Sequence, residues 1–446
     1  SGYPRKWVGN CPFEKGSIMT HDIHLHHITR IEGHGNLVLN IREGTIEELR
    51  LEIVESPRFF EVMLKGRRFD EAPHITSRIC GICAISHTTA SIKACEAAMD
   101  IVPSEETVLL RKILINAEVL QSHILHVYLL ALPDFFGVGS IIPMVDTNPD
   151  IVRRALRLKR AANEVCRVLV GRHVHPIGMD IGGFKRLPTQ KDLDEVRGLL
   201  ESTAPDMDET IRFFEGIKMP EFNRATRYIS LRSKDEYALY DGRLYKKGIP
   251  PIEPARYKEL ITEEVIEYST AKHARSGDES IMVGALARVN NNYEYLCDEA
   301  KEAARRLGLE PPSTNPFMNN IAQVVESIHC IHDSLKLLDL LSSRSLRGEK
   351  SQRKIKAGNG VGAVEAPRGT LYHEYDIDEK GVIQGVNCII PTAQNLSNIE
   401  EDIRSMVPTI IELPKNEIEQ RLEMLVRAYD PCISCSTHFL EVKFVE

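Results

Sequence analysis

Two pairs of cysteines near opposite ends of the chain are the strongest chemical signal in the sequence. Cys80 and Cys83 lie in Arg-Ile-Cys-Gly-Ile-Cys-Ala-Ile-Ser-His, and Cys432 and Cys435 lie in Asp-Pro-Cys-Ile-Ser-Cys-Ser-Thr-His. A Cys-x-x-Cys turn directs two sulfurs toward one point, so two turns supply four thiolates, which suit zinc, iron–sulfur clusters or nickel. We therefore expect both ends of the chain to meet at one metal.

A structural zinc site is the simplest alternative. Zinc modules usually hold their cysteine pairs a few tens of residues apart, whereas these pairs are separated by most of the chain. Each pair is also followed by a histidine, His87 or His438, and preceded by a charged residue, Arg78 or Asp430. A zinc ion saturated by four thiolates does not need such groups, so the sequence favours a reactive centre.

Composition indicates a globular protein and excludes several functional classes. Of the 446 residues, 42% are hydrophobic and 27% are charged, which excludes disordered and collagen-like chains. The net charge of −8 does not favour a nucleic-acid partner. No apolar run approaches the roughly 20 residues of a membrane span, and none is expected. The 10 cysteines are too few for a disulfide scaffold, which favours a reducing, cytoplasmic location.

Long helical stretches are expected to form the core. Ser104 is a helix-capping residue before an apolar repeat that ends at Pro133, and Asn148-Pro149 begins a repeat that ends at Gly171. A third repeat follows Asn315-Pro316 and reaches Leu341. Further helical patterns cover 190–217, 294–307 and 400–428. Helices of this length are expected to pack as a bundle.

Strand pairs are expected at the edge of this bundle. Residues 36–55, 228–247 and 369–390 each carry strand patterns around a turn. The predicted fold class is mainly α (α+β), with a central bundle of long helices and small peripheral β-sheets. No repeat or biased linker divides the chain, so residues 19–446 are interpreted as one domain. Residues 1–18 are interpreted as a leader or expression remnant with no assigned role.

Several motifs, in the family's order along the chain, closely resemble the large subunit of nickel–iron hydrogenases. They are Thr29-Arg30-Ile31-Glu32-Gly33-His34, the two cysteine segments, His175-Pro176 with Gly182-Gly183, Glu365-Ala366-Pro367-Arg368-Gly369 and Ile389-Ile390-Pro391-Thr392-Ala393-Gln394-Asn395. The first cysteine segment looks like that of the soluble, cytoplasmic, multi-subunit branch. The resemblance implies the nickel–iron hydrogenase large-subunit fold and reversible heterolytic cleavage of H2.

The resemblance also implies a nickel–iron centre and a separate magnesium ion. Cys80 and Cys432 would be terminal nickel ligands, and Cys83 and Cys435 would bridge nickel to an iron that carries carbon monoxide and two cyanides. Pro391 and Thr392 would line these diatomic ligands, and Thr392 would donate to a cyanide. Cofactor contacts are implied for Ala366, Pro367, Leu371, Pro391 and Thr392. Magnesium would be bound by Glu61, the backbone carbonyl of Cys388 and His438.

The reaction requires a Lewis acid with an open position beside a base, which nickel and a terminal thiolate supply. By resemblance, the Cys432 sulfur takes the proton and Glu32 is the gate through which it leaves. Arg368 would hold a guanidinium over the open position, fixed by Asp430. His87 would donate a hydrogen bond to a bridging sulfur.

Ordinary roles for three of these residues remain open. Glu32 could be a surface carboxylate, Arg368 could make a surface ion pair, and His87 could be a core histidine with its hydrogen bonds satisfied.

Two features depart from the family's pattern. Many relatives carry an acid immediately before the histidine of the long first helix, where this chain has Ser122 before His123, so Asp430 must hold Arg368 alone. Relatives are also usually cut after the histidine of the second cysteine segment, whereas this chain continues to Glu446. The extension is either a retained tail or that of an unprocessed precursor.

Electrons must leave through another subunit, because no further cysteine set remains for an electron-carrying cluster. The resemblance implies a small subunit with a proximal iron–sulfur cluster, and diaphorase or ferredoxin-type electron-transfer subunits with flavin. The alternative hypothesis is a non-catalytic, metal-stapled scaffold subunit of a redox complex. Glu32, Arg368 and Asp430 favour the enzyme, because a scaffold needs neither a proton gate nor a cation over an open coordination site.

Overall fold

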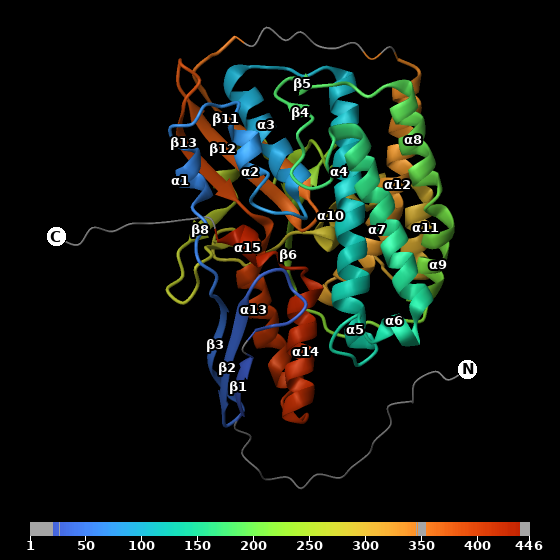
Figure 1. Cartoon of the computed structure of the whole chain (residues 1–446). Coiled ribbons are helices and arrows are strands. Elements are labelled where there is room, and N and C mark those ends of the chain that lie inside the picture. Colours follow the sequence, from blue (N-terminus) through green and yellow to red (C-terminus); the bar gives the residue numbers. More distant parts are fainter. Residues whose placement is uncertain (1–20, 26, 345, 347–353, 438–446) are drawn as a thin grey trace, which may run out of the picture.

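The structure is a computed structural model, and it describes residues 21–25, 27–344, 346 and 354–437 of the chain. Long helices occupy one side of the molecule, and small sheets lie along the other (Figure 1). The mainly helical fold class is confirmed. The assignment of residues 19–446 to one domain stays a prediction, and residues 1–18 lie outside the described part.

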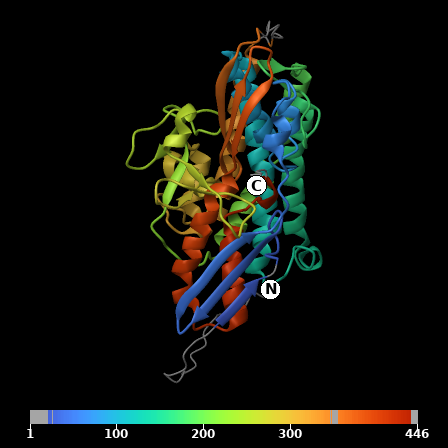
Figure 2. The same cartoon turned by 90° about the vertical axis from the view of Figure 1, so that its left-hand side faces the viewer.

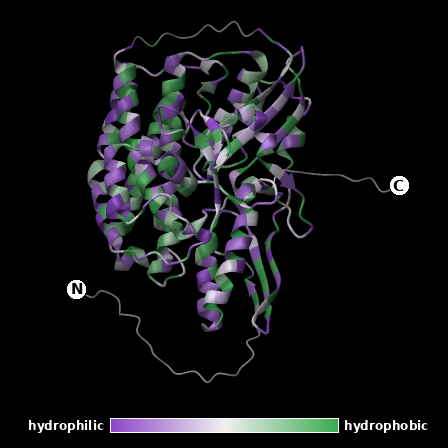
Figure 3. Ribbon diagram, turned by 180° about the vertical axis from the view of Figure 1, so that it is seen from behind, coloured by the Kyte–Doolittle hydropathy of each residue, from purple (hydrophilic) through white to green (hydrophobic). Residues whose placement is uncertain are grey.

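Three long helices form the centre of the helical side. Helix α4 (Glu105–Ile124) packs between α7 (Pro149–Val170) and α12 (Asn319–Ser342). The predicted start of α4 is confirmed, because the Ser104 side chain accepts a hydrogen bond from the Thr107 N–H. Helix α7 ends as predicted at Gly171, which has φ 80°. Figure 3 shows hydrophobic and hydrophilic bands along the outer helices, as expected where one face is buried.

The predicted end of the first helix at Pro133 is wrong. Helix α4 continues through the π-helical segment η1 (Leu125–Ala131) into α5 (Leu132–Phe135). Pro133 therefore lies inside the last turn of a continuous helix, which ends two residues later at Phe135. The combined helix Glu105–Phe135 is long and apolar enough to cross a membrane, but 83% of its most apolar window is buried within the fold.

Three-stranded sheets include all of the predicted strand pairs. The first sheet has the order β1 (His21–Leu25), β2 (Gly35–Arg42), β3 (Thr45–Ile53) and is antiparallel. In the second, β6 (Arg227–Arg232) lies between β7 (Arg243–Lys246) and β10 (Ile281–Met282). The third has the order β11 (Gly358–Ala366), β12 (Gly369–Ile377), β13 (Ile383–Ile389). Figure 2 shows the first and third sheets following one another along the molecule.

Shorter elements complete the described part of the chain. The helices are α1 (Phe60–Leu64), α2 (Ala72–Thr76), α3 (Ala84–Met99), α6 (Met144–Thr147), α8 (Gln190–Glu201), α9 (Ala204–Glu215), α10 (Ala285–Asn292), α11 (Asp298–Arg306), α13 (Pro391–Ile410), α14 (Lys415–Ala428) and α15 (Ile433–Ser436). Short 3-10 segments are η2 (Pro254–Glu259), η3 (Tyr293–Tyr295) and η4 (Pro316–Met318), and the short strands are β4 (Met179–Asp180), β5 (Gly183–Phe184), β8 (Thr262–Glu264) and β9 (His273–Arg275).

Helix α3 and strand β11 make an unusually close contact. Three glycines at alternate positions of β11, Gly358, Gly360 and Gly362, face the α3 backbone. A Cβ atom on Gly360 would lie 2.1 Å from the carbonyl oxygen of Ala94. Only glycine allows this approach, which fixes the helix that follows the first cysteine pair against the strand that leads to Arg368.

Candidate metal centre

The four predicted cysteine ligands meet at one point. Cys80 and Cys432 are 352 positions apart in the sequence, yet their Sγ atoms are 3.6 Å apart. The Sγ atoms of Cys83 and Cys435 are 3.8 Å apart, and all four lie within 4.8 Å of one another. All four side chains are buried, and they lie among apolar residues such as Ile79, Leu371 and Ile390. This geometry confirms the prediction that both ends of the chain meet.

The sulfur spacing suits a metal. Two thiolates bound to a tetrahedral zinc ion at about 2.3 Å lie about 3.8 Å apart, close to the two cross-chain distances. The Sγ atoms of Cys432 and Cys435 are closer, at 2.7 Å, so metal binding requires these two sulfurs to separate.

The start of helix α3 holds the first cysteine pair in place. Cys83 immediately precedes the helix, and its backbone N–H lies 3.4 Å from the Cys80 Sγ atom, to which it donates. Glu118 of α4 accepts hydrogen bonds from the backbone N–H groups of Ile85 at 2.5 Å and Ser86 at 2.9 Å. A carboxyl group from a neighbouring helix therefore satisfies two donors in the first turn of α3.

The second cysteine turn is attached to the segment around Glu32. The Glu32 carbonyl accepts from the Ile433 N–H at 2.8 Å, and its carboxylate Oε2 accepts from the Ser434 N–H at 3.0 Å. Gly33 makes this approach possible, since it has φ 87° and a Cβ there would lie 2.7 Å from the Ile433 Cβ. Glu32, the predicted proton gate, therefore also holds the second cysteine turn in its conformation.

Glu32 also reaches a metal ligand directly. Its Oε2 atom lies 3.1 Å from the Cys432 sulfur, within hydrogen-bond range for a thiol donor. The side chain is half-buried, so it lies between the enclosed sulfurs and the protein surface. On the other side of the turn, the Cys432 N–H donates to the Thr392 hydroxyl oxygen at 2.9 Å. The Thr392 hydroxyl hydrogen can then donate into the cavity beside the sulfurs.

Arg368 is buried and is held by Asp430 as predicted. Its Nε donates to the Asp430 carbonyl at 2.7 Å, and its Nη2 donates to the Asp430 carboxylate at 2.9 Å. The Nη1 atom is buried and has no hydrogen-bond partner among the described residues. Gln323 of α12 donates to the other Asp430 carboxylate oxygen at 3.0 Å. The ion pair is therefore fixed, and the Nη1 amino group of the guanidinium is unused.

A small cavity of about 10 Å³, enough for about one water-sized molecule, lies beside the sulfurs. It brings together seven of the ten predicted catalytic and cofactor residues. Its lining includes Cys83, Cys432 and Cys435 together with His87, Ala366, Arg368, Leu371, Ile390, Pro391 and Thr392. The predicted residues Glu32, Asp430 and Pro367 are not part of this lining. The walls are mainly apolar, so a polar group inside interacts strongly with Arg368.

His87 lies in this cavity wall, but its hydrogen-bond partner there is another histidine. Its Nδ1 atom is 3.2 Å from Nε2 of His373, and Nδ1 of His373 is 2.8 Å from the Tyr375 hydroxyl. A hydrogen bond from His87 to a bridging sulfur would therefore come from Nε2. The predicted donation to sulfur stays a prediction.

The sulfurs share protons when no metal is present. Hydrogen bonds from Cys432, Cys435 and Cys83 lower the pKa of Cys80, whereas burial raises the pKa of Cys432 and of Cys435. Without a metal, the cluster therefore keeps most of its thiols protonated. A metal ion replaces these protons, because the thiolate is the ligand form.

Two of the three predicted magnesium ligands lie together. Glu61 is 8% exposed, and its Oε1 atom accepts from the Cys388 N–H at 2.9 Å. The third, His438, lies outside the described residues. A buried carboxylate is chemically suited to magnesium, which prefers oxygen ligands, and the Cys388 carbonyl stays a predicted ligand.

The residues fit a nickel–iron centre. Four buried sulfurs supply soft ligands, and a small apolar cavity adjoins them. The unused Nη1 of Arg368 is a donor that small ligands of such a centre can satisfy. A zinc ion saturated by four thiolates would use neither the cavity nor this donor.

Sequence reasoning missed several residues that hold the site. Arg58 Nη2 donates to the Ile79 carbonyl at 2.5 Å and to the Ser434 carbonyl, so one side chain joins the two cysteine segments. Glu118 and Gln323 also act from separate helices. No residue spacing in the sequence predicts these contacts. The only clue is that Arg58 directly precedes the apolar segment that contains Glu61.

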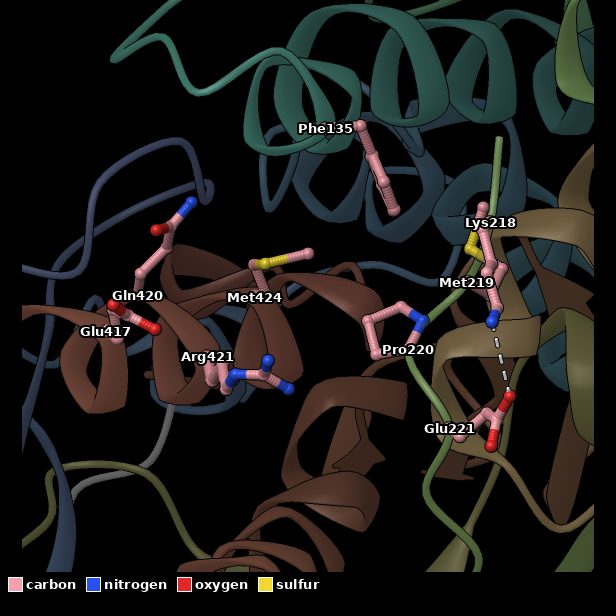
Figure 4. A pocket seen from close by; sticks show the side chains of 9 residues that line it. All are labelled: Phe135, Lys218, Met219, Pro220, Glu221, Glu417, Gln420, Arg421 and Met424. Atoms are coloured by element: carbon pink, nitrogen blue, oxygen red, sulfur yellow. Dashed lines mark ion pairs between the residues drawn. The ribbon is translucent and has the colours of Figure 1, made fainter. Parts of the chain in front are cut away.

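Another hollow lies far from this chemistry. It is bordered by the end of α5, by residues 218–221 and by α14 (Figure 4). Phe135, Met219 and Met424 give it an apolar surface, and Lys218 lies 3.6 Å from Glu221 in an exposed ion pair. It contains no cysteine or histidine, so it offers no soft metal ligands.

Comparisons with known proteins agree with this chemistry. A family model described as nickel-dependent hydrogenase matches residues 58–149 and 230–438. The alpha subunit of sulfhydrogenase 1 from Pyrococcus furiosus is 34% identical over 94% of this chain and 98% of the relative. One component of the F420-non-reducing hydrogenase of Methanothermobacter marburgensis is 31% identical over 93% of this chain and 94% of the relative. The beta subunit of the NAD-reducing hydrogenase HoxS of Cupriavidus necator is 28% identical over the same shares, 93% and 94%.

Solved structures show the same fold. A NAD+-reducing NiFe hydrogenase in the H2-reduced state superposes with a TM-score of 0.80 and 26% identity, covering 94% of this chain and 100% of the other. A reduced Ni-Fe-Se hydrogenase of Desulfovibrio vulgaris Hildenborough has a TM-score of 0.77 with 23% identity over 94% and 100% of the chains, and supports the fold alone. With the four cysteines assembled and this extent of similarity, the chain belongs to the nickel-dependent hydrogenase family.

Proposed function

We propose that this hydrogenase subunit cleaves H2 heterolytically in the cavity lined by Cys432 and Arg368, with Glu32 in contact with the Cys432 sulfur. The observation that carries the proposal is the 3.1 Å distance from the Cys432 sulfur to the Glu32 carboxylate. A base and a proton acceptor are in contact there, at the wall of a small buried cavity that also contains a fixed cation. When bound, a nickel–iron centre supplies the Lewis acid with an open position.

The protein's own residues move the proton. The Cys432 sulfur accepts a proton from H2 and passes it across 3.1 Å to Glu32 Oε2. The Ser434 N–H, 3.0 Å from the same oxygen, keeps the carboxylate turned toward the sulfur. Because Glu32 is half-buried, it can release the proton toward the surface. In each cycle the Cys432 sulfur is protonated while Glu32 is ionised, and the proton then passes from the sulfur to the carboxylate.

Arg368 acts from the cavity wall. Asp430 balances its charge and fixes the guanidinium through Nε and Nη2, so Nη1 can polarise a small molecule in the cavity. Leu371, Ile390 and Pro391 exclude water from the same space. A cation held in an apolar site needs no rearrangement when charge develops, and this lowers the barrier.

We assign the cofactor contacts by the same resemblance. Cys80 and Cys432 would be the terminal nickel ligands, and Cys83 and Cys435 would be the ligands shared with iron. Pro391 and the Thr392 hydroxyl would contact the carbon monoxide and cyanides of the iron, together with Ala366, Pro367 and Leu371. Glu61, the backbone carbonyl of Cys388 and His438 would bind magnesium.

The partners follow from what this chain lacks. Each of the three relatives is named as one component of a hydrogenase, so they work in assemblies. After the four ligands are assigned, the remaining cysteines form no second metal-binding group among the described residues. We propose a cytoplasmic complex in which the electrons pass to a small subunit with an iron–sulfur cluster, with flavin-containing diaphorase or ferredoxin-type subunits beyond it.

The central test removes the Glu32 carboxylate without changing its size. Glu32→Gln is expected to retain nickel and iron but to lose at least about 100-fold in H2/D+ exchange, since positioned acid–base groups contribute about 10²–10⁴-fold. Glu55→Gln is the matched control, because Glu55 lies nearby and pairs with the exposed His34. Exchange that is unchanged in Glu32→Gln would remove Glu32 from the reaction. Zinc in place of nickel, without infrared bands of metal-bound carbon monoxide and cyanide, would contradict the centre itself.

A further inference from the structure

Arg288 of helix α10 is a completely buried arginine close to the site but outside the cavity. Its relative exposure is 0%, and it is not among the residues that line the cavity. Burying a guanidinium costs free energy unless it is paired and hydrogen-bonded. The contacts of Arg288 therefore indicate its structural role.

All five N–H groups of Arg288 are used. Nε and Nη2 donate to the two carboxylate oxygens of Glu326 at 2.7 and 2.6 Å. Nη1 donates to Glu365 at 3.1 Å and to the Ala366 carbonyl at 2.9 Å, and Nη2 also donates to the Pro367 carbonyl at 2.9 Å. The side chain therefore binds two carboxylates on one side and two consecutive backbone carbonyls on the other.

These carbonyls belong to the residues that immediately precede Arg368. Ala366 is the last residue of β11, and Gly369 begins β12, so Pro367 and Arg368 form a tight turn. Gly284, just before α10, packs against the same turn, since a Cβ there would lie 3.2 Å from the Arg368 carbonyl oxygen. The Arg288 side chain and Gly284, the residue before helix α10, thus both contact the backbone of the turn.

We infer that Arg288 is a positioning residue that sets the place of the Arg368 guanidinium over the sulfurs. Asp430 fixes two nitrogens of Arg368, but it does not fix the backbone from which that side chain extends. Arg288 supplies this second constraint. The inference rests on the proposed function, because it concerns the residue that acts on H2.

The arrangement requires arginine. A lysine at position 288 has three donors on one nitrogen and cannot bind Glu326 bidentately while reaching both carbonyls. The turn would then be held by fewer bonds, and Arg368 would shift. A displacement of about 1 Å in a catalytic group can cost about 100-fold in rate.

The experiment compares Arg288→Lys with Arg111→Lys in the assembled enzyme. Arg111 is the matched control, since it is also 0% exposed and binds Glu96 with two nitrogens, at 3.0 and 2.7 Å, but has no contact with residues 366–368 among the described interactions. Both variants are expected to lower the midpoint of thermal unfolding similarly. Only Arg288→Lys is expected to lower H2/D+ exchange by at least about tenfold at full nickel and iron content, in line with the cost of misplacement.

A double-mutant cycle shows whether Arg288 acts through Arg368. In an Arg368→Lys background, Arg288→Lys is expected to cause little further loss of exchange, because its target is already gone. Independent, multiplicative losses, or equal losses in the Arg111 control, would overturn the inference. So would a crystal structure of Arg288→Lys with the Arg368 guanidinium in its original place.

A second variant covers the case in which Arg288→Lys does not accumulate. Glu326→Gln leaves Arg288 in place but removes the charge that anchors it, and it should cause the same Arg368-dependent loss in a milder form. Infrared bands of the iron-bound diatomic ligands should shift in the same variants, a readout separate from turnover. Failure of the proposed function would be distinct, since wild-type enzyme would then lack nickel or exchange.

Discussion

Replacing Gly360 by alanine tests whether the close approach of β11 to α3 builds the metal centre. The added Cβ would lie 2.1 Å from the Ala94 carbonyl oxygen and 2.3 Å from the Ala98 nitrogen. Ordinary contact begins near 3.5 Å, so strand and helix must separate by roughly 1 Å or more. Both obstacles are backbone atoms, which cannot rotate away as a side chain would.

The expected cost lies at the upper end of overpacking effects, about 3 kcal/mol in the free energy of unfolding. Gly358 and Gly362 depend on the same approach, so their contacts with α3 loosen as well. Because Cys83 immediately precedes α3 and Arg368 follows β11, the variant should also bind less nickel.

The assay is thermal and urea unfolding of the purified enzyme, with nickel and iron measured on the same samples. Gly198→Ala is the control, because Gly198 lies within helix α8 with nothing within 4 Å of its added Cβ. That substitution should stabilise the protein by about 0.5–1 kcal/mol, since alanine is the better helix former. Equal stability and metal content in Gly360→Ala and wild type would refute the reasoning.

Two further predictions concern the surroundings of the sulfurs. Gly33→Ala should fold but lose nickel, because its Cβ would press on Ile433 at 2.7 Å and displace the second cysteine turn; Gly35→Ala, whose nearest neighbour would be at 3.7 Å, should keep its metal. Burial raises the pKa of Glu118 from 4.5 to about 8, so the folded protein holds a proton that the unfolded chain has released, and stability should fall as pH rises from about 4.5 to 8. Glu118→Gln should flatten that decline in urea midpoints measured across this range, and an unchanged slope would show that Glu118 does not cause it.

The sequence predicted the elements that carry local signals. Ser104 before α4, Pro149 at the start of α7 and Gly171 at its end mark helix boundaries by chemistry confined to a few residues. Helix α3 was not predicted, because nearly all of its residues are buried and no polar face produces a helical period. Strand β11 was missed for a related reason: its glycines serve contact with α3, and most of its other residues are buried on both faces.

The candidate site could be predicted for residues within motifs but not for those that hold them. Cys80, Cys432, Glu32 and Arg368 stand in recognisable segments, and the structure brings these segments together. Arg58 reaches Ser434 across 376 positions, and Arg288 reaches Pro367 across 79. Such contacts depend on how the elements pack, and no local pattern encodes them.

The electrostatics of the site explain how the chain can fold before a metal arrives. Burial keeps the pKa of Cys432 and Cys435 high, so the empty cluster carries little negative charge. Arg368 is neutralised by Asp430 at 2.9 Å and does not depend on thiolates for its partner. Folding therefore buries few unpaired charges, and most of the thiolates form only as metal binding displaces their protons. It follows that metal uptake releases protons and weakens as pH falls, while the fold of the metal-free chain persists.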